Sequence, residues 1–265
     1  MTKPIDRLCS AAKAFGAAPQ ESPALPEEGP RELRSAANAF NRTREQIRGH
    51  LDERNRMIAA LAHDLRTPLT KLQLRLARVE PETLRNQLAE PAKGMNAILT
   101  QGLEFARSLR TEEPMTKVDL PSFLQSLADD YADLGRAVTF ECDSALEANP
   151  QTGILPARPL CLKRCMENLL TNACAYAGSA EIRLTAEKEA LVVTVSDRGP
   201  GIPEELLEKV FEPYFRVEGS RNRASGGTGL GLAIARNMAQ LNGAALSLAN
   251  RPGGGLVVTL RFRRP

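Results

Sequence analysis

The 265-residue sequence has no tryptophan, few aromatic residues (4%) and only two histidines, His50 and His63. Two imidazoles cannot build a three-histidine metal site, so that kind of catalytic centre is excluded. The five cysteines lack CxxC spacing and are odd in number, which argues against a zinc ribbon or a disulfide framework and favours a reducing, cytosolic setting. Cys161 and Cys165 stand one helical turn apart, and we expect them to be buried small apolar side chains rather than metal ligands.

Long apolar runs and a strong charge of one sign are also missing. No stretch of eighteen residues lacks a charge, and the amino-terminal segment has no apolar core, so we expect neither a membrane span nor a secretion signal. Lysine and arginine (35) barely exceed aspartate and glutamate (32), which argues against a nucleic-acid partner held by phosphate neutralisation. With 42% apolar and 25% charged residues the chain is globular, and its length suits two or three small units.

Two amphipathic helices are expected in residues 1–53. Their apolar positions alternate at spacings of three and four, which is typical of coiled coils. These positions are Ile5, Leu8, Ala12 and Phe15 in the first helix, and Leu33, Ala36 or Ala37, Phe40, Ile47 and Leu51 in the second. The connector is rich in proline, alanine and glutamate and cannot be helical throughout. Such narrow stripes need a partner, most simply a second copy of the chain.

A helical hairpin is expected next, because the apolar stripe runs on to about residue 79 and resumes after the turn at Glu80-Pro81-Glu82. We expect Pro68 to bend the first arm, and Pro91 and Gly94 to bend or loosen the second. The stripe consists of Ile58, Leu61, Leu65, Leu72, Leu76 and Val79, then Leu84, Leu88, Met95, Ile98, Leu99, Phe105 and Leu109. The leucines predict the core of a helical bundle.

From about residue 117 the pattern becomes that of a mixed α/β unit, in which short β-rich runs alternate with helical segments. We expect strands at Val138–Cys142, Ala180–Ala186, Leu191–Ser196, Ala245–Leu248 and Leu256–Phe262, and helices at 121–135, 158–177 and 229–242. The second and third strands are close enough to form a hairpin through residues 187–190, so the sheet is mixed. An α/β sandwich follows.

Two glycine-rich segments lie where expected elements end or begin. Residues 196–202 end a strand in a turn, and residues 226–233 run into a helix, where free N–H groups and the helix dipole could bind a phosphate. A helix and a polar loop are expected between them. Neither segment matches a P-loop or a dinucleotide fingerprint. One such turn is as often structural as functional, whereas two together favour a ligand site.

Polar side chains accompany these glycines. Asp197 ends a strand beside them and could accept a hydrogen bond from an exocyclic amine. Either Glu167 or Asn168 lies one turn from Asn172 on a single helix face, and amide oxygens at that spacing could hold Mg²⁺. The alternative for this segment is an ordinary solvated helix face.

His63 lies on the long helix beside the apolar stripe. Asp64 follows it directly, and Thr67 lies one turn on along the same side, next to the expected bend. A lone helical histidine is ordinarily a surface residue. An adjacent acid, a hydroxyl and a local distortion favour a reactive one.

Five motifs occur in an order and spacing that resemble the boxes of bacterial sensor histidine kinases. Residues 63–68 resemble the phosphoacceptor box, 167–173 the N box, 197–201 the first glycine box, 211–216 the F box and 227–232 the second glycine box. Together these motifs are highly specific, and the likeness covers nearly the whole chain. It is greatest to the osmosensor-type kinases of proteobacteria.

The resemblance implies a multi-domain protein with three parts. Residues 1–53 resemble a HAMP signal relay, residues 54–112 would form the dimerisation and histidine-phosphotransfer hairpin, and residues 117–265 the catalytic ATP-binding domain. The implied fold is an all-α coiled-coil relay and a four-helix-bundle homodimer, followed by an α/β sandwich of the Bergerat (GHKL) ATPase type. Since HAMP modules of this family follow a membrane helix, the chain would be the cytoplasmic portion of an inner-membrane protein.

The resemblance also implies the reaction. His63 would take the γ-phosphoryl group of ATP-Mg²⁺, with Asp64 fixing the imidazole tautomer, and pass it to an aspartate of a response regulator. Thr67 would orient water when the same hairpin dephosphorylates that regulator. Specificity for the regulator would lie around residues 71–78.

The implied nucleotide and metal contacts come from the N, F and glycine boxes. Asn172 and Asn168 would hold Mg²⁺, and a mobile lid at 216–227 would carry arginines. The implied ATP contacts are Asn168, Asn172, Tyr176, Asp197, Gly199, Gly201, Ile202, Arg216, Val217, Thr228, Gly229, Leu230, Gly231 and Leu232.

One position departs from the family pattern. Three residues after Asn172, where the family often has a basic phosphate contact, this chain has Ala175. A lid arginine could replace that contact, or the balance could move toward the phosphatase direction. Two further alternatives stay open: a GHKL-type ATPase without phosphotransfer, and a non-catalytic scaffold that binds a regulator.

Overall fold

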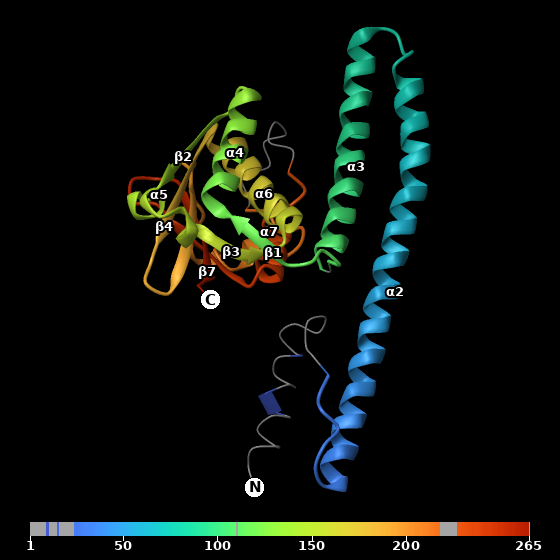
Figure 1. The fold of residues 1–265 in the computed structure, drawn as a ribbon. Coiled ribbons are helices and arrows are strands. Elements are labelled where there is room, and N and C mark those ends of the chain that lie inside the picture. Colours follow the sequence, from blue (N-terminus) through green and yellow to red (C-terminus); the bar gives the residue numbers. More distant parts are fainter. Residues whose placement is uncertain (1–8, 11–14, 16–23, 110, 218–226, 265) are drawn as a thin grey trace. The chain divides into compact units, whose positions relative to one another are not determined.

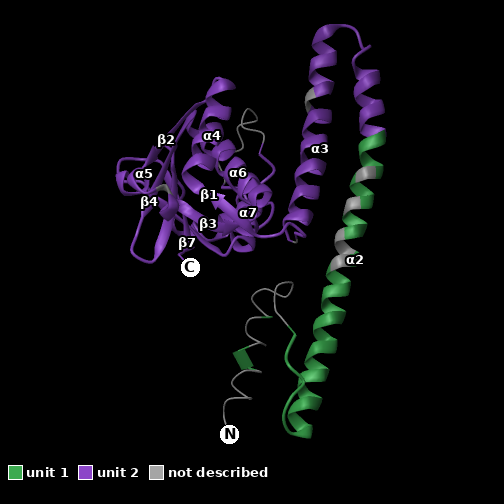
Figure 2. Cartoon of the chain, viewed as in Figure 1, with its two compact units in different colours: residues 1–67 green, residues 68–265 purple. Residues whose placement is uncertain are grey.

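The computed structural model describes residues 9–10, 15, 24–109, 111–217 and 227–264. The chain divides into two compact units, residues 1–67 and 68–265, and the division falls inside one continuous helix (Figure 2). Across the described residues, we find no helix that is both long enough and apolar enough to cross a membrane.

Two long helices form the predicted hairpin. Helix α2 runs from Arg31 to Leu76 and helix α3 from Glu82 to Ser108 (Figure 1). The turn falls at the predicted place, which confirms the hairpin. Pro68 and Pro91 lie inside these helices, and neither proline ends its helix.

The connector before α2 packs on that helix through Asn41, whose side chain is only 8% exposed. Asn41 Oδ1 accepts from the Leu25 N–H (2.9 Å), and Asn41 Nδ2 donates to the Leu25 carbonyl oxygen (2.9 Å). Phe15 meets Phe40 edge to face with ring centroids 5.7 Å apart. Apart from Cys9, Ser10 and Phe15, the first expected helix lies outside the described residues.

The second unit contains a five-stranded mixed sheet in the order β2-β4-β5-β7-β6. Its strands are β2 (Ala137–Cys142), β4 (Ser179–Ala186), β5 (Ala190–Ser196), β6 (Ala244–Asn250) and β7 (Leu256–Arg263). Strands β2 and β4 pair in parallel, and every other pair in this sheet is antiparallel. The predicted strands and the predicted mixed pairing are confirmed.

Three helices cover one face of this sheet: α4 (Leu120–Asp133), α6 (Pro159–Ala177) and α7 (Gly231–Leu241) (Figure 1). Alternating side chains of β4 and β7 point into the core, as a half-buried strand requires. Helix α6 ends at Gly178, whose φ of 75° is the left-handed C-terminal cap that glycine favours. All three predicted helices and the α/β sandwich are confirmed.

Cys161 and Cys165 of α6 belong to this core, as predicted. Cys161 is 4% exposed and Cys165 is fully buried. Burial raises the pKa of the Cys165 thiol to about 12, so the thiol stays neutral. In the described part of the chain no cluster of histidine, cysteine and acidic residues could hold a metal ion.

The shortest helices, strands and turns were not predicted from the sequence. They are β1 (Thr116–Asp119), which pairs antiparallel with β3 (Ile154–Ala157), helix α5 (Ser144–Ala148), and the 3-10 turns Pro150–Gly153, Glu204–Leu206 and Lys209–Phe211. The prediction of a helix between the two glycine-rich segments was wrong for the described residues. Between these segments the described residues contain only the 3-10 turns Glu204–Leu206 and Lys209–Phe211. Pro203 and Pro213 flank these turns and interrupt helical hydrogen bonding.

Candidate functional site

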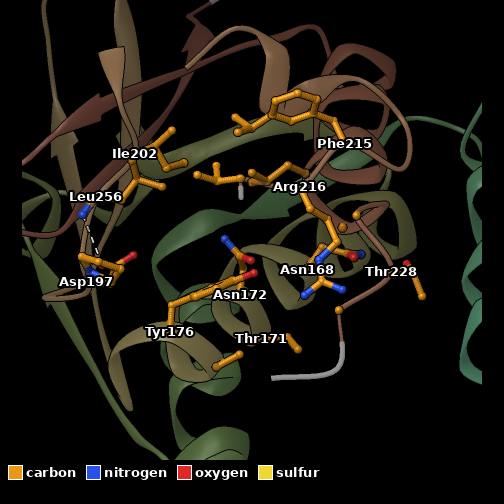
Figure 3. A pocket seen from close by; sticks show the side chains of 18 of the residues that line it. Asn168, Thr171, Asn172, Tyr176, Asp197, Ile202, Phe215, Arg216, Thr228 and Leu256 are labelled. Atoms are coloured by element: carbon orange, nitrogen blue, oxygen red, sulfur yellow. Dashed lines mark hydrogen bonds between the residues drawn. The ribbon is translucent and has the colours of Figure 1, made fainter. Parts of the chain in front are cut away.

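A pocket of about 950 Å³ opens between α6, the turn after β5 and the segment leading into α7 (Figure 3). This volume lies within the range of small-molecule sites. The structure brings nearly all of the predicted nucleotide contacts to its wall. These are Asn168, Asn172, Tyr176, Asp197, Gly201, Ile202, Arg216, Val217, Thr228, Gly229, Gly231 and Leu232.

Asp197 is the buried carboxylate of the pocket, with 8% of its surface exposed. Its Oδ1 accepts hydrogen bonds from the Gly199 N–H (2.8 Å) and the Leu256 N–H (3.2 Å). Both donors use the same oxygen, so Oδ2 is left to accept a hydrogen bond from a ligand (Figure 3). Gly199 does not line the pocket but holds this carboxylate in place.

Asn250 fixes the loop that carries Gly201 and Ile202. Its Oδ1 accepts from the Ile202 N–H (2.9 Å), and its Nδ2 donates to the Ile202 carbonyl oxygen (2.6 Å). Gly201 has a φ of +74°, and a Cβ there would lie 2.8 Å from Asn250 Oδ1. The position therefore requires glycine, both for its backbone conformation and for this close approach.

The polar face of α6 supplies the amides of the pocket. Asn168 Nδ2 donates to the Arg164 carbonyl oxygen (2.8 Å), which turns Oδ1 toward the start of α7 at Gly231. Asn172 lies one turn further along the same face (Figure 3). These amide oxygens are of the ligand type that Mg²⁺ takes, and Mg²⁺ keeps waters and substrate phosphates as its other ligands.

A tight contact joins the F-box segment to the second glycine-rich segment. Tyr214 has a φ of 66° and its N–H donates to the Gly229 carbonyl oxygen (3.0 Å). A Cβ at Gly229 would lie 2.8 Å from the Phe215 carbonyl oxygen. Next to it, the Thr228 hydroxyl donates to Gln101 Oε1 of α3.

Leu230 is a correction to the predicted contact set. It is fully buried in the hydrophobic core and does not line the pocket, because its side chain points away from the cavity at the start of α7. Most of the predicted lid, residues 218–226, lies outside the described residues. Arg216 and Val217 are described, and the Arg216 side chain reaches toward Asn168 (Figure 3).

The predicted phosphoacceptor box, residues 63–68, lies within helix α2, and all of its residues are helical. Asp64 and Thr67 are exposed, and the side chain of His63 lies outside the described part of the structure. His63, Asp64 and Thr67 belong to the first compact unit and the pocket to the second.

Several residues that line the pocket belong to no sequence motif and were not predicted. Gln101 and Glu104 come from α3, and Leu256 comes from β7. Tyr131 of α4 supports the N-box turn, since its hydroxyl hydrogen bonds with Thr171 Oγ1 (3.1 Å) and donates to the Glu167 carbonyl oxygen (3.3 Å). Burial raises the pKa of Tyr131, so the phenol keeps its proton.

Comparisons with known proteins agree with this geometry. Residues 157–265 match the family described as histidine kinase-, DNA gyrase B- and HSP90-like ATPase. The sensor histidine kinase GtrS of Pseudomonas aeruginosa is 39% identical over 263 residues, which are 99% of this chain and 53% of that protein. The sensor histidine kinase CpxA of Escherichia coli K12 is 28% identical over 267 residues, which are 97% of this chain and 57% of that protein. The chain thus spans about half the length of the curated relatives it matches.

Two solved structures share the fold. Full-length ShkA in complex with AMPPNP has a TM-score of 0.60 at 21% identity, over 78% of this chain and 45% of that one. Histidine kinase ThkA in complex with response regulator protein TrrA has a TM-score of 0.55 at 24% identity, over 82% of this chain and 64% of that one. Together with the family match of residues 157–265, these structures confirm long amino-terminal helices followed by an α/β sandwich of the GHKL ATPase type.

Proposed function

We propose that this chain is the catalytic core of a sensor histidine kinase, which phosphorylates its own His63 from ATP and transfers the phosphoryl group to a response regulator. The observation that carries this proposal is the pocket in which a fixed, buried Asp197 faces the amides of α6 across two glycine-rich segments. The 39% identity to a sensor histidine kinase along nearly the whole chain supports it.

Nucleotide recognition follows from the pocket wall. Asp197 Oδ2 accepts a hydrogen bond from the adenine amine, and Gly201 and Gly229 let the backbone approach the ligand closely. The N-terminus of α7 faces the phosphates. Arg216, which lines the pocket, supplies the positive charge that Ala175 cannot.

Mg²⁺ supplies charge neutralisation of the phosphates when bound. Asn172 would hold it through the side-chain oxygen, helped by Asn168, whose amide nitrogen donates to the Arg164 carbonyl oxygen and whose Oδ1 lies beside the start of α7. The contribution of these two residues is to orient the triphosphate, since phosphoryl transfer depends mainly on position and charge.

The phosphoryl transfer itself requires a neutral imidazole. Asp64 accepts a hydrogen bond from the Nδ1–H of His63, which leaves the Nε2 lone pair to attack the γ-phosphorus. The new N–P bond forms as the bond to the β,γ-bridging oxygen breaks, and ADP leaves. An aspartate of the regulator then takes the phosphoryl group, and Thr67 orients the water that removes it from the regulator again.

The proposal extends to assembly and location. The large apolar side chains exposed along the hairpin support a homodimer in which two hairpins form a four-helix bundle; they are Met57, Leu61, Leu65, Leu72, Leu74, Leu84, Leu88, Met95 and Ile98. Residues 1–53 serve as a HAMP-like relay, 54–112 as the phosphotransfer hairpin and 117–265 as the ATP-binding domain. The whole belongs to an inner-membrane receptor of the osmosensor type, of which this is the cytoplasmic portion.

Incubation of the full chain with γ-labelled ATP and Mg²⁺ tests the reaction. We expect an acid-labile, base-stable phosphoprotein that His63→Gln abolishes without loss of ATP binding. His50→Gln is the matched control, because His50 is an exposed histidine of the same helix outside the motif, and it should label like the parent. Asn172→Ala should abolish labelling, and Arg216→Ala should weaken ATP binding.

Two other outcomes would favour the two alternative functions. Steady release of phosphate without a labelled protein would indicate a GHKL-type ATPase. Failure to bind ATP at millimolar concentration would indicate a scaffold that binds a regulator without catalysis.

A further inference from the structure

A side chain from another helix contacts the turn of α6 that carries the two pocket amides. Asn168 and Asn172 lie one helical turn apart, with Thr171 beside them (Figure 3). Tyr131 of α4 does not line the pocket, yet its hydroxyl donates to the Glu167 carbonyl oxygen (3.3 Å) and lies 3.1 Å from Thr171 Oγ1. The geometry of this turn therefore depends on a residue outside the pocket.

The two contacts of Tyr131 fix the direction in which the hydroxyl protons are donated. A phenol carries a single proton, and burial raises the pKa of Tyr131, so the proton stays in place at neutral pH. Because that proton goes to the Glu167 carbonyl oxygen, the Thr171 hydroxyl is the donor in its bond with Tyr131. Donation thus runs from Thr171 through Tyr131 to the backbone of Glu167.

The Thr171 hydroxyl has an alternative partner within its own helix. A threonine in a helix can donate to the carbonyl oxygen four residues earlier, and such a bond often bends the helix. For Thr171 that oxygen belongs to Glu167, the atom that Tyr131 already bonds. Tyr131 therefore draws the Thr171 proton away from the helix backbone and removes this cause of bending from the turn that carries Asn168 and Asn172.

We propose that Tyr131 is a positioning residue for the metal: through Thr171 it sets the spacing of Asn168 and Asn172, which would hold Mg²⁺. The inference rests on the Mg²⁺ site of the proposed function. Mg²⁺ requires its oxygen ligands in near-ideal octahedral geometry at about 2.0–2.1 Å, so a small bend of this turn weakens its binding.

The carboxylate that faces adenine has a separate support. Asp197 follows β5, and the N–H groups of Gly199 and Leu256 hold its Oδ1. A bend within α6 leaves these bonds in place. Loss of the Tyr131 hydroxyl should therefore weaken nucleotide binding in the presence of Mg²⁺ and spare binding in its absence, whereas general damage to the pocket would weaken both.

Titration calorimetry of the full chain with ADP, once with Mg²⁺ and once with EDTA, tests the proposal. Tyr131→Phe removes one hydroxyl and keeps the ring. We expect it to lower the affinity for ADP with Mg²⁺ by about two- to tenfold, the range for one rearranged hydrogen bond, and to leave the affinity in EDTA unchanged. The Mg²⁺ concentration that gives half-maximal labelling of His63 should rise by the same factor.

A double-mutant cycle examines the part played by the Thr171 hydroxyl. Thr171→Val removes the proton that would turn to the Glu167 carbonyl oxygen. In the Thr171→Val background, Tyr131→Phe should therefore change the Mg²⁺-dependent affinity by less than about twofold. An equal loss in both backgrounds would show that Thr171 takes no part, and would overturn the proposal.

Asp130→Asn is the matched control. Asp130 precedes Tyr131 on α4 and forms an exposed ion pair with Lys163 of α6 (3.7 Å). Its substitution removes a second polar link between the same two helices, and because exposed pairs contribute little, the Mg²⁺-dependent affinity should stay that of the parent.

Two further outcomes would overturn the positioning role. If Tyr131→Phe lowered ADP affinity equally with and without Mg²⁺, or lowered neither, the role would fall while labelling of His63 in the parent kept the kinase function. If Mg²⁺ did not raise the ADP affinity of the parent, the Mg²⁺ site of the proposed function would fall together with the role of Tyr131.

Discussion

The hairpin and the α/β part of the molecule differ in how far their leucine side chains are exposed to solvent. Leu61 and Leu65 of α2 are 62% and 50% exposed, whereas Leu170 of α6 and Leu184 of β4 are fully buried. Both regions have regular apolar spacing, so the pattern alone does not tell them apart. The difference teaches that the α/β part closes its own core, while the hairpin leaves apolar side chains exposed, which is the surface that the proposed dimer would bury.

The largest effect is expected from truncation in the self-contained core. Leu184→Ala deletes a fully buried side chain in β4 between two neighbouring strands, and the cavity should lower the free energy of unfolding by about 2–5 kcal/mol. Denaturant unfolding followed by circular dichroism measures it. A loss below about 1 kcal/mol would mean that this core is loosely packed and would weaken the contrast with the hairpin.

A smaller effect is expected from truncation on the hairpin, and it should appear in association. Leu72→Ala combined with Leu84→Ala should weaken the proposed dimer by about tenfold or more, because each substitution removes apolar area that the partner would bury. Analytical ultracentrifugation over a range of concentrations measures this. Both leucines are 42% exposed in the single chain.

Leu134→Ala is the matched control for that pair. Leu134 is 74% exposed but lies at the end of α4 in the α/β part, so its removal should leave association unchanged. If Leu134→Ala weakened the dimer as much as the hairpin pair does, the covered surface would not be the hairpin.

The smallest effect is expected at the polar connector of the first unit. Hydrogen bonds from Asn38 and Asn41 lower the pKa of Glu27 below 4.5. Its ionised form therefore stabilises the packing of the connector on α2 above the unfolded pKa, and this contribution is lost as the pH falls through the lowered value.

Exchange of the Leu25 amide against pH reports that change. Protection should fall on acidification in the parent, and Glu27→Gln should remove this pH dependence. If protection of the Leu25 amide depended on pH in the same way in both proteins, a group other than Glu27 would be responsible for the change.

Sequence patterns predicted the elements that contain enough residues to show a period. Helix α6 (19 residues) and strand β7 (8 residues) were found nearly to the residue, because burial repeats several times along each. Strands β1 and β3 have four residues each and pair across the linker, so neither shows an alternation of its own. Their pairing joins residues far apart in the sequence, so a short stretch of sequence cannot predict it.

The candidate site divides in the same way. The motifs predicted Asp197, Gly201, Gly229 and Gly231, and the structure places all four on the pocket wall, because a close approach of backbone to a cavity imposes a local sequence pattern. Asn250 was missed because it acts on the backbone of Ile202, 48 positions away. Leu230 was misassigned because a motif groups neighbouring residues, whereas the helix that starts there turns its side chain into the core.

The position of β7 has a consequence for synthesis. This strand lies between β5 and β6 in the sheet, although it follows both in sequence. On the ribosome, the hairpin helices emerge and can fold while β5 and β6 still lack the strand that joins them. The proposed pairing of two hairpins needs no residue of β7, so a nascent chain stalled before Leu256 would be able to make it. The same chain cannot complete the wall behind Asp197, because the Leu256 N–H donates to that carboxylate.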